Sequence, residues 1–342
     1  MSTELGRLLK PYASVSIIGM CKNAGKTTVL NALIRDFSGS GQALALTSIG
    51  RDGESTDLVT GTQKPGIFVP EGTLIATASQ LLLRHCDVTR EILDTTGIST
   101  PMGEVAIFRA RSAGAVQLAG PSMTAQLARL REIFYSLGAQ KVIFDGALSR
   151  KTLCSRSVSD ATVLCTGASY HADPVTVAED TAHQCRLLTL PETDDLAIRQ
   201  FARTHPDFRG FAIFFGQDIW QLPPAIALSD ALRNPEAEGA RSVLFGGALT
   251  DFSLKPLLMS TARLQGLRFI VRDSSKLLLS RDSVEKLQRR GAELQVLDSV
   301  NLVAVTVNPF SAYGHSCDKE TLSALLRQRI DLPVINVMEE AI

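Results

Sequence analysis

Residues 15–34 decide the fold, and their sequence is VSIIGMCKNAGKTTVLNALI. The first four form an apolar β-branched run that predicts a buried strand. A glycine-bearing loop follows, and from Thr27 onward apolar residues recur at the spacing of one helix face. Gly25-Lys26-Thr27 therefore sits where a strand, a loop and a helix meet. That is the context that a phosphate-binding P-loop requires.

In a P-loop, backbone N–H groups and a helix N-terminus face the phosphates of the ligand. The lysine reaches the β- and γ-phosphate oxygens, and the hydroxyl that follows it holds Mg²⁺. Lys26 and Thr27 take these two roles here, so we expect Thr27 to be a metal ligand. The residues that we assign to nucleotide binding are Gly19, Lys22, Asn23, Ala24, Gly25, Lys26, Thr27 and Thr28.

The glycine spacing departs from the usual G-x-x-x-x-G-K-[ST] pattern. Residue 20 is Met20, and Gly19 lies one position earlier, which gives G-x5-G-K-T. This spacing is similar to that of dethiobiotin synthetases and related SIMIBI-class nucleotide-binding proteins. The strand and helix patterns on either side disfavour a chance Gly-Lys-Thr at an ordinary helix start. We therefore predict a nucleoside triphosphate site for ATP with Mg²⁺, and GTP is left open as an alternative.

The second predicted strand, residues 43–47, leads into SIGRDGES at residues 48–55. Small and acidic residues beyond the carboxyl end of a strand are where open α/β sheets bind ligands. A carboxylate at this position in SIMIBI-type proteins helps to hold Mg²⁺ or orients the attacking water. Asp52 and Glu54 are therefore catalytic candidates together with Lys26, and Asp52 is favoured. The alternative is an exposed turn, since Arg-Asp-Gly is good turn chemistry.

A third strand ends in a further candidate ligand. Residues 141–145 read KVIFD, an apolar run that ends in Asp145 about a hundred residues after the P-loop. This is the Walker B pattern, whose carboxylate holds Mg²⁺ through its water shell. We predict that Thr27 and Asp145 act on one metal ion.

The alternation of strands and helices predicts an α/β protein, a SIMIBI-like P-loop NTPase with a mostly parallel sheet. We assign residues 1–220 to the nucleotide-binding domain, with an inserted β-rich element at about 60–118. Residues 221–240 form a connection, and residues 241–342 form a smaller C-terminal α/β domain.

Local patterns give more detailed expectations inside these domains. The spacing of apolar residues predicts a helix over 79–93, a loop over 95–103, and a strand over 104–110 that pairs with 115–118. Three strand ends in the C-terminal domain carry polar or glycine residues and favour a second ligand or partner site. They are Gly246-Gly247, Asp273-Ser274-Ser275 and Asn308-Pro309.

Composition excludes several functional classes. The 342 residues contain 35 Lys and Arg and 35 Asp and Glu, and this zero formal net charge argues against a nucleic-acid-binding surface. No apolar run is long enough for a bilayer, and the first residues lack a signal pattern, so we expect a cytoplasmic protein without a membrane partner. Six scattered cysteines without a CxxC pair favour neither zinc nor disulfides.

Beyond the P-loop and the 48–55 turn, three segments carry a wider resemblance: FVPEGT at 68–73, FDGALSR at 144–150 and VNPF at 307–310. With these, the chain resembles the reactivase subunit encoded alongside lysine 5,6-aminomutase in lysine-fermenting bacteria. The resemblance implies an ATPase that helps an adenosylcobalamin-dependent aminomutase to release damaged cofactor. The implied partners are that aminomutase or a second reactivase subunit, and a homo-oligomer is left open. The cobalamin-binding D-x-H-x-x-G pattern is absent.

Other functions fit the same motifs. An ATP-dependent ligase or kinase resembling dethiobiotin synthetase would need a substrate pocket, which the element at 60–118 could supply. A GTPase metallochaperone is disfavoured because the guanine-reading N-K-x-D pattern is missing. A nucleotide-binding scaffold without turnover is the fourth alternative.

Overall fold

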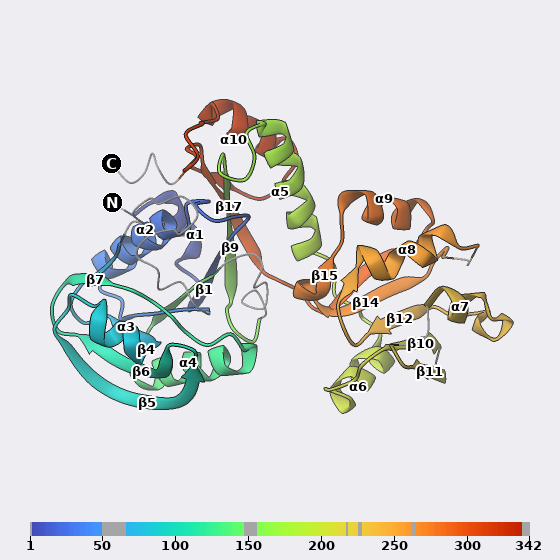
Figure 1. Cartoon of the computed structure of the whole chain (residues 1–342), viewed down its shortest axis with the longest axis horizontal. Helices are drawn as coiled ribbons and strands as arrows, with labels where there is room; N and C mark the ends of the chain where they lie inside the picture. Colours follow the sequence, from blue (N-terminus) through green and yellow to red (C-terminus); the bar gives the residue numbers. More distant parts are fainter. Residues whose placement is uncertain are drawn as a thin grey trace. The chain divides into compact units, whose positions relative to one another are not determined.

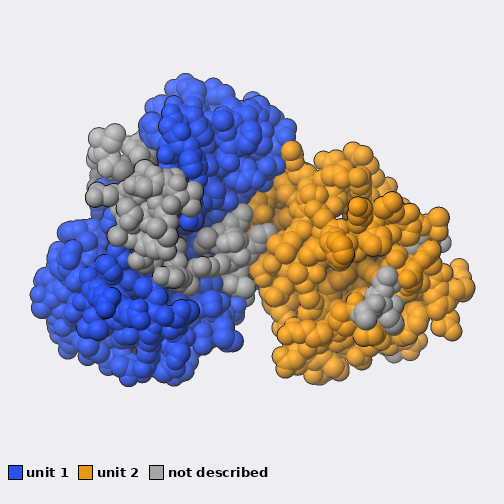
Figure 2. Space-filling model, in the orientation of Figure 1, with its two compact units in different colours: residues 1–182, 301–342 blue, residues 183–300 orange. Residues whose placement is uncertain are grey.

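The structure is a computed structural model that describes residues 2–49, 66–146, 156–216, 218–224, 228–261 and 264–336. Contacts between residues divide the chain into two compact units (Figures 1 and 2). Unit 1 comprises residues 1–182 and 301–342, and unit 2 comprises residues 183–300.

Unit 1 is built on a nine-stranded sheet. Its strands are β1 (Ser14–Gly19), β2 (Leu44–Ser48), β4 (Leu74–Ala78), β5 (Arg90–Thr100), β6 (Gly103–Ala110), β8 (Lys141–Asp145), β9 (Ala161–Gly167), β17 (Leu302–Asn308) and β18 (Val334–Ile335). Their order is β18-β17-β9-β1-β8-β2-β4-β6-β5, parallel from β18 to β4, with β6 antiparallel to its two neighbours. Every residue of β1, β2, β4, β8 and β9 is buried, as expected for parallel strands covered on both faces.

The helices of unit 1 lie between some of these strands along the chain (Figure 1). They are α1 (Glu4–Leu9), α2 (Lys26–Gly39), α3 (Ser79–Arg84), α4 (Thr124–Ser136), α5 (Pro174–Leu188), which continues into unit 2, and α10 (Lys319–Arg327). Helix α2 packs against β1, β2 and β8 through buried residues such as Leu30, Leu33 and Phe37. This packing fixes the start of α2 beside the carboxyl ends of the parallel strands.

In the region predicted as an inserted element, some of the observed helices and strands differ from those that the sequence pattern predicts. The helix predicted over 79–93 ends at Arg84, and the region predicted as a loop over 95–103 lies mostly in strand β5. Strand β6 pairs with β4 and β5, whereas β7 (Gly114–Val116) pairs with the short strand β3 (Ile67–Val69).

The composition of β5 explains this outcome. Its β-branched residues fit a half-buried strand. The side chains of Thr96 and Ile98 are buried, and Gly97 between them is exposed. The Thr100 hydroxyl donates to the Gly103 carbonyl in the turn that leads into β6. A tight turn thus joins two strands whose pairing outweighs the helical spacing of the leucines. In the described range 66–118, strands β4, β5 and β6 extend the main sheet.

Unit 2 contains a five-stranded sheet of its own. Its strands are β10 (Phe211–Phe215), β11 (Asp218–Leu222), β12 (Ser242–Phe245), β14 (Arg268–Asp273) and β16 (Glu293–Asp298). The order is β11-β10-β12-β14-β16, in which β12, β14 and β16 are parallel and β10 is antiparallel to both neighbours.

Alternate residues of these strands supply two separate cores. Phe211 and Ile213 face a core that includes residues of α8 (Asp251–Met259) and α9 (Arg281–Arg289). Ala212 and Phe214 face the opposite core, with residues of α6 (Leu196–Thr204). The remaining elements are α7 (Leu228–Arg233), the strand pair β13 (Leu249–Thr250) and β15 (Leu277–Leu278), and two 3₁₀ turns, 235–237 and 274–276. Period-two burial is the pattern of a sheet covered on both faces.

The two units differ from the predicted domains in a specific way. Strand β10, predicted within the first domain, belongs to the sheet of unit 2, and strands β17 and β18, predicted in the C-terminal domain, complete the sheet of unit 1. The chain leaves unit 1 through α5 and returns at residue 301, so the predicted boundary at 221–240 is not the division that the contacts give. Local patterns identified β10 and β17 as strands but not their partners, because β17 pairs with β9 far back in the sequence.

Within the described ranges, none of the helices has both the length and the apolar character needed to span a bilayer.

Candidate functional site

The loop that follows β1 has an unusual backbone conformation. Asn23 has a φ of 60° and Gly25 a φ of 93°, so two residues of one short loop adopt the left-handed region. Glycine adopts this conformation without strain, and asparagine tolerates it better than most residues do. The Met20 N–H donates to the Cys165 carbonyl at 2.8 Å, which ties the loop to the end of β9. Such a curled backbone is typical of anion-binding loops.

Helix α2 begins at the end of this loop without an internal cap. Its N-cap is Gly25, which has no side chain to accept the first N–H groups, and the first turn contains no acidic residue. The first N–H groups of a helix carry a partial positive charge and need an acceptor. The start of α2 at Lys26, Thr27 and Thr28 is therefore suited to an anionic ligand.

Lys26 lies back across the loop that precedes it. Its Nζ donates to the Cys21 carbonyl at 3.3 Å. A Cβ on Gly19 would stand 3.0 Å from Lys26 Cγ, so the glycine leaves the space that the lysine stem occupies. Burial raises the pKa of the Cys21 thiol to about 11, against the opposing effect of the Lys26 charge. The Lys26 ammonium group therefore lies beside the neutral Cys21 thiol.

Asp145 lies at the carboxyl end of β8, between the two strands that frame the site. In the register of the sheet it pairs with Ile17 of β1 and with Ser48 of β2, and only 7 % of its surface is exposed. The Ile49 N–H donates to the Asp145 carbonyl at 2.9 Å, and the Gly146 N–H donates to that of Ile17 at 3.0 Å. A carboxylate held on the strand next to a P-loop is suited to a hard cation such as Mg²⁺.

Ser48 ends strand β2 directly beside Asp145 in the sheet. Its hydroxyl is fully buried and has no hydrogen-bond partner in the part of the chain that the structure describes. The predicted catalytic residues Asp52 and Glu54 follow Ser48 in the sequence, but they lie outside the described residues. Their roles remain predictions.

Asn308 is a residue of the site that the sequence analysis did not assign to it. Its Nδ2 donates to the Asn23 carbonyl of the loop at 3.2 Å, and a Cβ on Gly25 would stand 3.2 Å from Asn308 Cβ. The Asn308 carbonyl accepts from the Ala168 N–H at 2.9 Å, and a Cβ on Gly167 would stand only 2.0 Å from it. The sequence signal, a polar residue at a strand end, was recognised but attributed to the wrong domain.

These residues together fit a polyphosphate ligand with a divalent cation. Asn23 Nδ2 is a buried donor without a partner among the described residues, beside the uncapped start of α2. Lys26 makes only a long bond to Cys21 within this loop. A buried polar group usually has a partner, so the Asn23 amide is suited to donate a hydrogen bond to a bound group.

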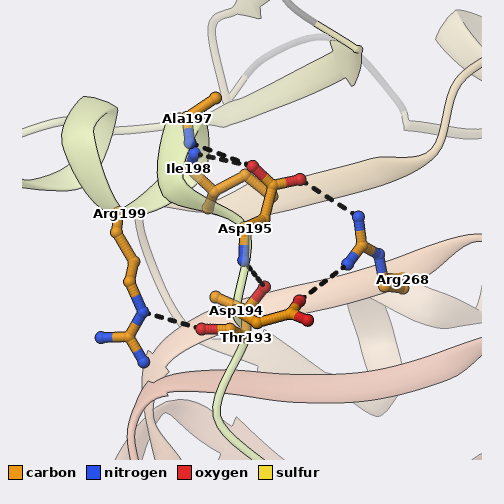
Figure 3. Close-up of polar contacts among 7 residues, drawn as sticks. All are labelled: Thr193, Asp194, Asp195, Ala197, Ile198, Arg199 and Arg268. Atoms are coloured by element: carbon orange, nitrogen blue, oxygen red, sulfur yellow. Dashed lines mark hydrogen bonds and ion pairs between the residues drawn. The ribbon is translucent and has the colours of Figure 1, made fainter.

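Unit 2 contains a different kind of polar cluster, shown in Figure 3. The Asp195 carboxylate accepts from the N–H groups of Ala197 and Ile198 at 3.0 and 3.3 Å, which caps helix α6. Arg268 donates to Asp195 at 3.1 Å and lies 3.6 Å from the Asp194 carboxylate. Each charge in this cluster faces an opposite charge or a helix terminus, which is typical of a structural network.

Near the carboxyl ends of the parallel strands in unit 2, Glu192 is also bonded within the unit, whereas the buried Ser275 hydroxyl has no partner among the described residues. Glu192 accepts from the Ser299 N–H and hydroxyl at 3.0 and 2.8 Å and from Arg199 at 2.9 Å. Burial raises the pKa of Asp298, and the charges of Asp273 and Glu192 raise it further. The second ligand site that we expected from these strand ends gains no support from this arrangement.

No protein-family model matches the chain, and a search of curated proteins finds no significant relative.

Proposed function

We propose that this chain binds a nucleoside triphosphate with Mg²⁺ and hydrolyses it, ATP being the expected nucleotide, to drive a change in a protein client. The observation that carries the proposal is the junction of β1 and α2. There a left-handed Gly25 starts an uncapped helix, Lys26 lies across the loop, and Asp145 ends the adjacent strand.

Each residue has a role in this proposal that follows from its chemistry. The loop N–H groups and the start of α2 would bind phosphate oxygens, and Lys26 would pair with the β- and γ-phosphates. The Thr27 hydroxyl would bind Mg²⁺ directly, and Asp145 would hold it through water. The metal supplies charge neutralisation at the phosphate oxygens. Asn308 would keep the loop in its binding shape, because it bonds the Asn23 carbonyl.

Hydrolysis requires a positioned water and little else from the protein, because phosphoryl transfer depends mainly on positioning and electrostatics. Asp52 is the proposed residue for orienting that water, and Glu54 is the alternative. Both would follow the end of β2, one strand away from Asp145.

The proposed client is an adenosylcobalamin-dependent aminomutase, alone or with a second reactivase subunit. This part of the proposal rests on the sequence resemblance. In it, nucleotide binding and hydrolysis loosen the enzyme so that damaged cofactor can leave.

Phosphate release from ATP and from GTP tests the proposal. We expect ATP turnover that rises on addition of the aminomutase and falls in Asp52→Ala, with nucleotide affinity in that variant close to wild type. Lys255→Ala, an exposed lysine of unit 2, is the control and should behave as wild type. Stimulation by a small metabolite instead of a protein would point to a ligase or kinase, and a strict GTP requirement would point to a metallochaperone. Absence of turnover under every condition would contradict the hydrolase assignment.

A further inference from the structure

A small hairpin follows Asn308 directly. Residues 309–317 fold back on themselves, with a bond from the Ser311 N–H to the His315 carbonyl at 3.0 Å and another from the Cys317 N–H to the Pro309 carbonyl at 3.0 Å. Phe310 and Ser316 form an antiparallel bridge across it. The hairpin is therefore an ordered element, and we call it the 309–317 hairpin.

The 309–317 hairpin is fixed to the loop between β9 and α5. A ring nitrogen of His315, Nε2, bonds the Ala168 carbonyl at 2.8 Å. The Ala312 N–H donates to the Ser169 hydroxyl at 3.2 Å. Because all these contacts lie within unit 1, the hairpin keeps a defined place beside the end of β17.

The hairpin exposes two aromatic side chains. Phe310 is 57 % exposed and Tyr313 is 55 % exposed. A single exposed apolar residue on a protein surface needs no explanation. Two aromatic residues on one anchored hairpin of nine residues form a larger apolar surface, and an aromatic face suits a planar ligand.

Asn308 joins this hairpin to the phosphate-binding loop through one amide group. Its Nδ2 donates to the Asn23 carbonyl, and its Oδ1 accepts from the Phe310 N–H at 3.1 Å. A ligand whose phosphates lie in the loop therefore has the aromatic hairpin next to it. The part of a nucleotide that extends away from its phosphates is the sugar and the base, and only the base is a flat aromatic system.

We propose that the 309–317 hairpin binds the base of the nucleotide, with Phe310 as the main stacking surface and Tyr313 as a second one. This inference rests on the proposed function, because it assigns a further part of the same ligand. Stacking tolerates any base, and the larger ring system of a purine gains more contact area. The bond between Asn308 and the Phe310 N–H fixes the backbone that carries the ring.

Binding of ATP and of inorganic tripolyphosphate, measured by calorimetry in the presence of Mg²⁺, separates base contacts from phosphate contacts. The double variant Phe310→Ala, Tyr313→Ala should lose about 10- to 100-fold in ATP affinity, the range expected for loss of base stacking. Its affinity for tripolyphosphate should stay unchanged. Phe310→Trp should retain ATP affinity, because indole is also a stacking surface.

Phe68→Ala is the matched control, since Phe68 is 59 % exposed in unit 1 but lies on β3, outside the hairpin. It should leave both affinities unchanged, and a thermal melt should show that all variants fold. Unchanged ATP affinity in the double variant would overturn this inference while leaving the phosphate site intact. An equal loss for both ligands would also overturn it, because it would mean that the hairpin supports the phosphate loop. A wild-type chain that binds neither ligand would overturn the proposed function and this inference together.

Discussion

The two units place polar residues at the carboxyl ends of parallel strands in contrasting ways. In unit 1, these ends carry the curled loop with Asn23 and the buried hydroxyl of Ser48, each with a polar group that has no partner among the described residues. In unit 2, Glu192 is bonded to Ser299 and Arg199, and Asp273 accepts from the Ser275 N–H at 2.8 Å. The carboxylates of Glu192 and Asp273 are thus bonded within unit 2, although the buried Ser275 hydroxyl beside Asp273 also has no partner among the described residues.

The comparison shows which feature marks a site. Polar residues at strand ends occur in both units, so their presence does not discriminate between a binding edge and a structural one. What differs is the backbone beside them: unit 1 has a loop with two left-handed residues and an uncapped helix start, whereas the carboxylates of Glu192 and Asp273 in unit 2 accept bonds from nearby groups. The same distinction predicts opposite responses to mutation. In unit 1, changes should affect ligand binding, and in unit 2 they should affect stability.

Asp145→Asn should give the largest effect among the residues that support the loop between β1 and α2. Loss of the carboxylate charge removes an expected partner of the hydrated metal ion, and the affinity for ATP with Mg²⁺ should fall about 10- to 100-fold. The affinity measured with EDTA should change little. Equal losses with and without metal would show that Asp145 is a structural strand end.

Asn308→Ala should have a smaller effect, because Asn308 acts through the loop. The variant loses the bonds to the Asn23 carbonyl and the Phe310 N–H, and a typical hydrogen bond contributes about 1 kcal/mol. We expect ATP affinity to fall about fivefold, a difference of about 1 kcal/mol. Calorimetric titration measures it, and Asn301→Ala, which removes a bond to the Asp160 carbonyl in the same unit, is the control. A similar loss of affinity in both variants would indicate general destabilisation.

Glu192→Gln should leave ATP affinity unchanged and lower the stability of unit 2. The variant exchanges a carboxylate for an amide opposite Arg199 and two Ser299 donors, at a cost of about 1–2 kcal/mol. Urea unfolding followed by the signal of Trp220, the single tryptophan of the chain and a residue of unit 2, measures this cost. A loss of ATP affinity at full stability would give the strand ends of unit 2 a ligand-related role.

Asp298→Asn should produce the smallest effect, and it should be stabilising. The pKa of this carboxyl is raised in the folded state, so the folded state holds its proton to higher pH than the unfolded state does. As the pH rises above the pKa of Asp298 in the unfolded state, the carboxyl ionises more readily in the unfolded state, and the free energy of unfolding falls. Because Asp298 is exposed, the gain at neutral pH should stay below about 1 kcal/mol and should vanish at pH 3. Lower stability of the variant at pH 7 would contradict this.

Much of the proposed phosphate-binding region could be predicted from local sequence. The strand over 15–18, the helix after Gly25 and the strand that ends at Asp145 all form as expected, because each depends on contiguous apolar residues and on glycine or lysine at fixed positions. The site geometry around Lys26 follows from those elements.

The remaining features depend on contacts that no local pattern contains. Asn308 reaches Asn23 across 285 residues of sequence, so the domain assignment of β17 could not be made from strand patterns alone. The prediction of a helix over 79–93 was wrong beyond Arg84, because the pairing of β5 with β6 outweighs the helical spacing of the leucines. The catalytic assignment to Asp52 and Glu54 falls outside the described residues and remains a prediction.

The central claim is that the edge of unit 1 binds a nucleoside triphosphate through Lys26. The measurement that tests it most directly is calorimetric binding of ATP with Mg²⁺ to the wild type and to Lys26→Ala, with a thermal melt of each. We predict that the variant folds normally and binds at least about 100-fold more weakly, because it loses a charge-assisted contact to the phosphates. Equal affinity in the two proteins would contradict the claim.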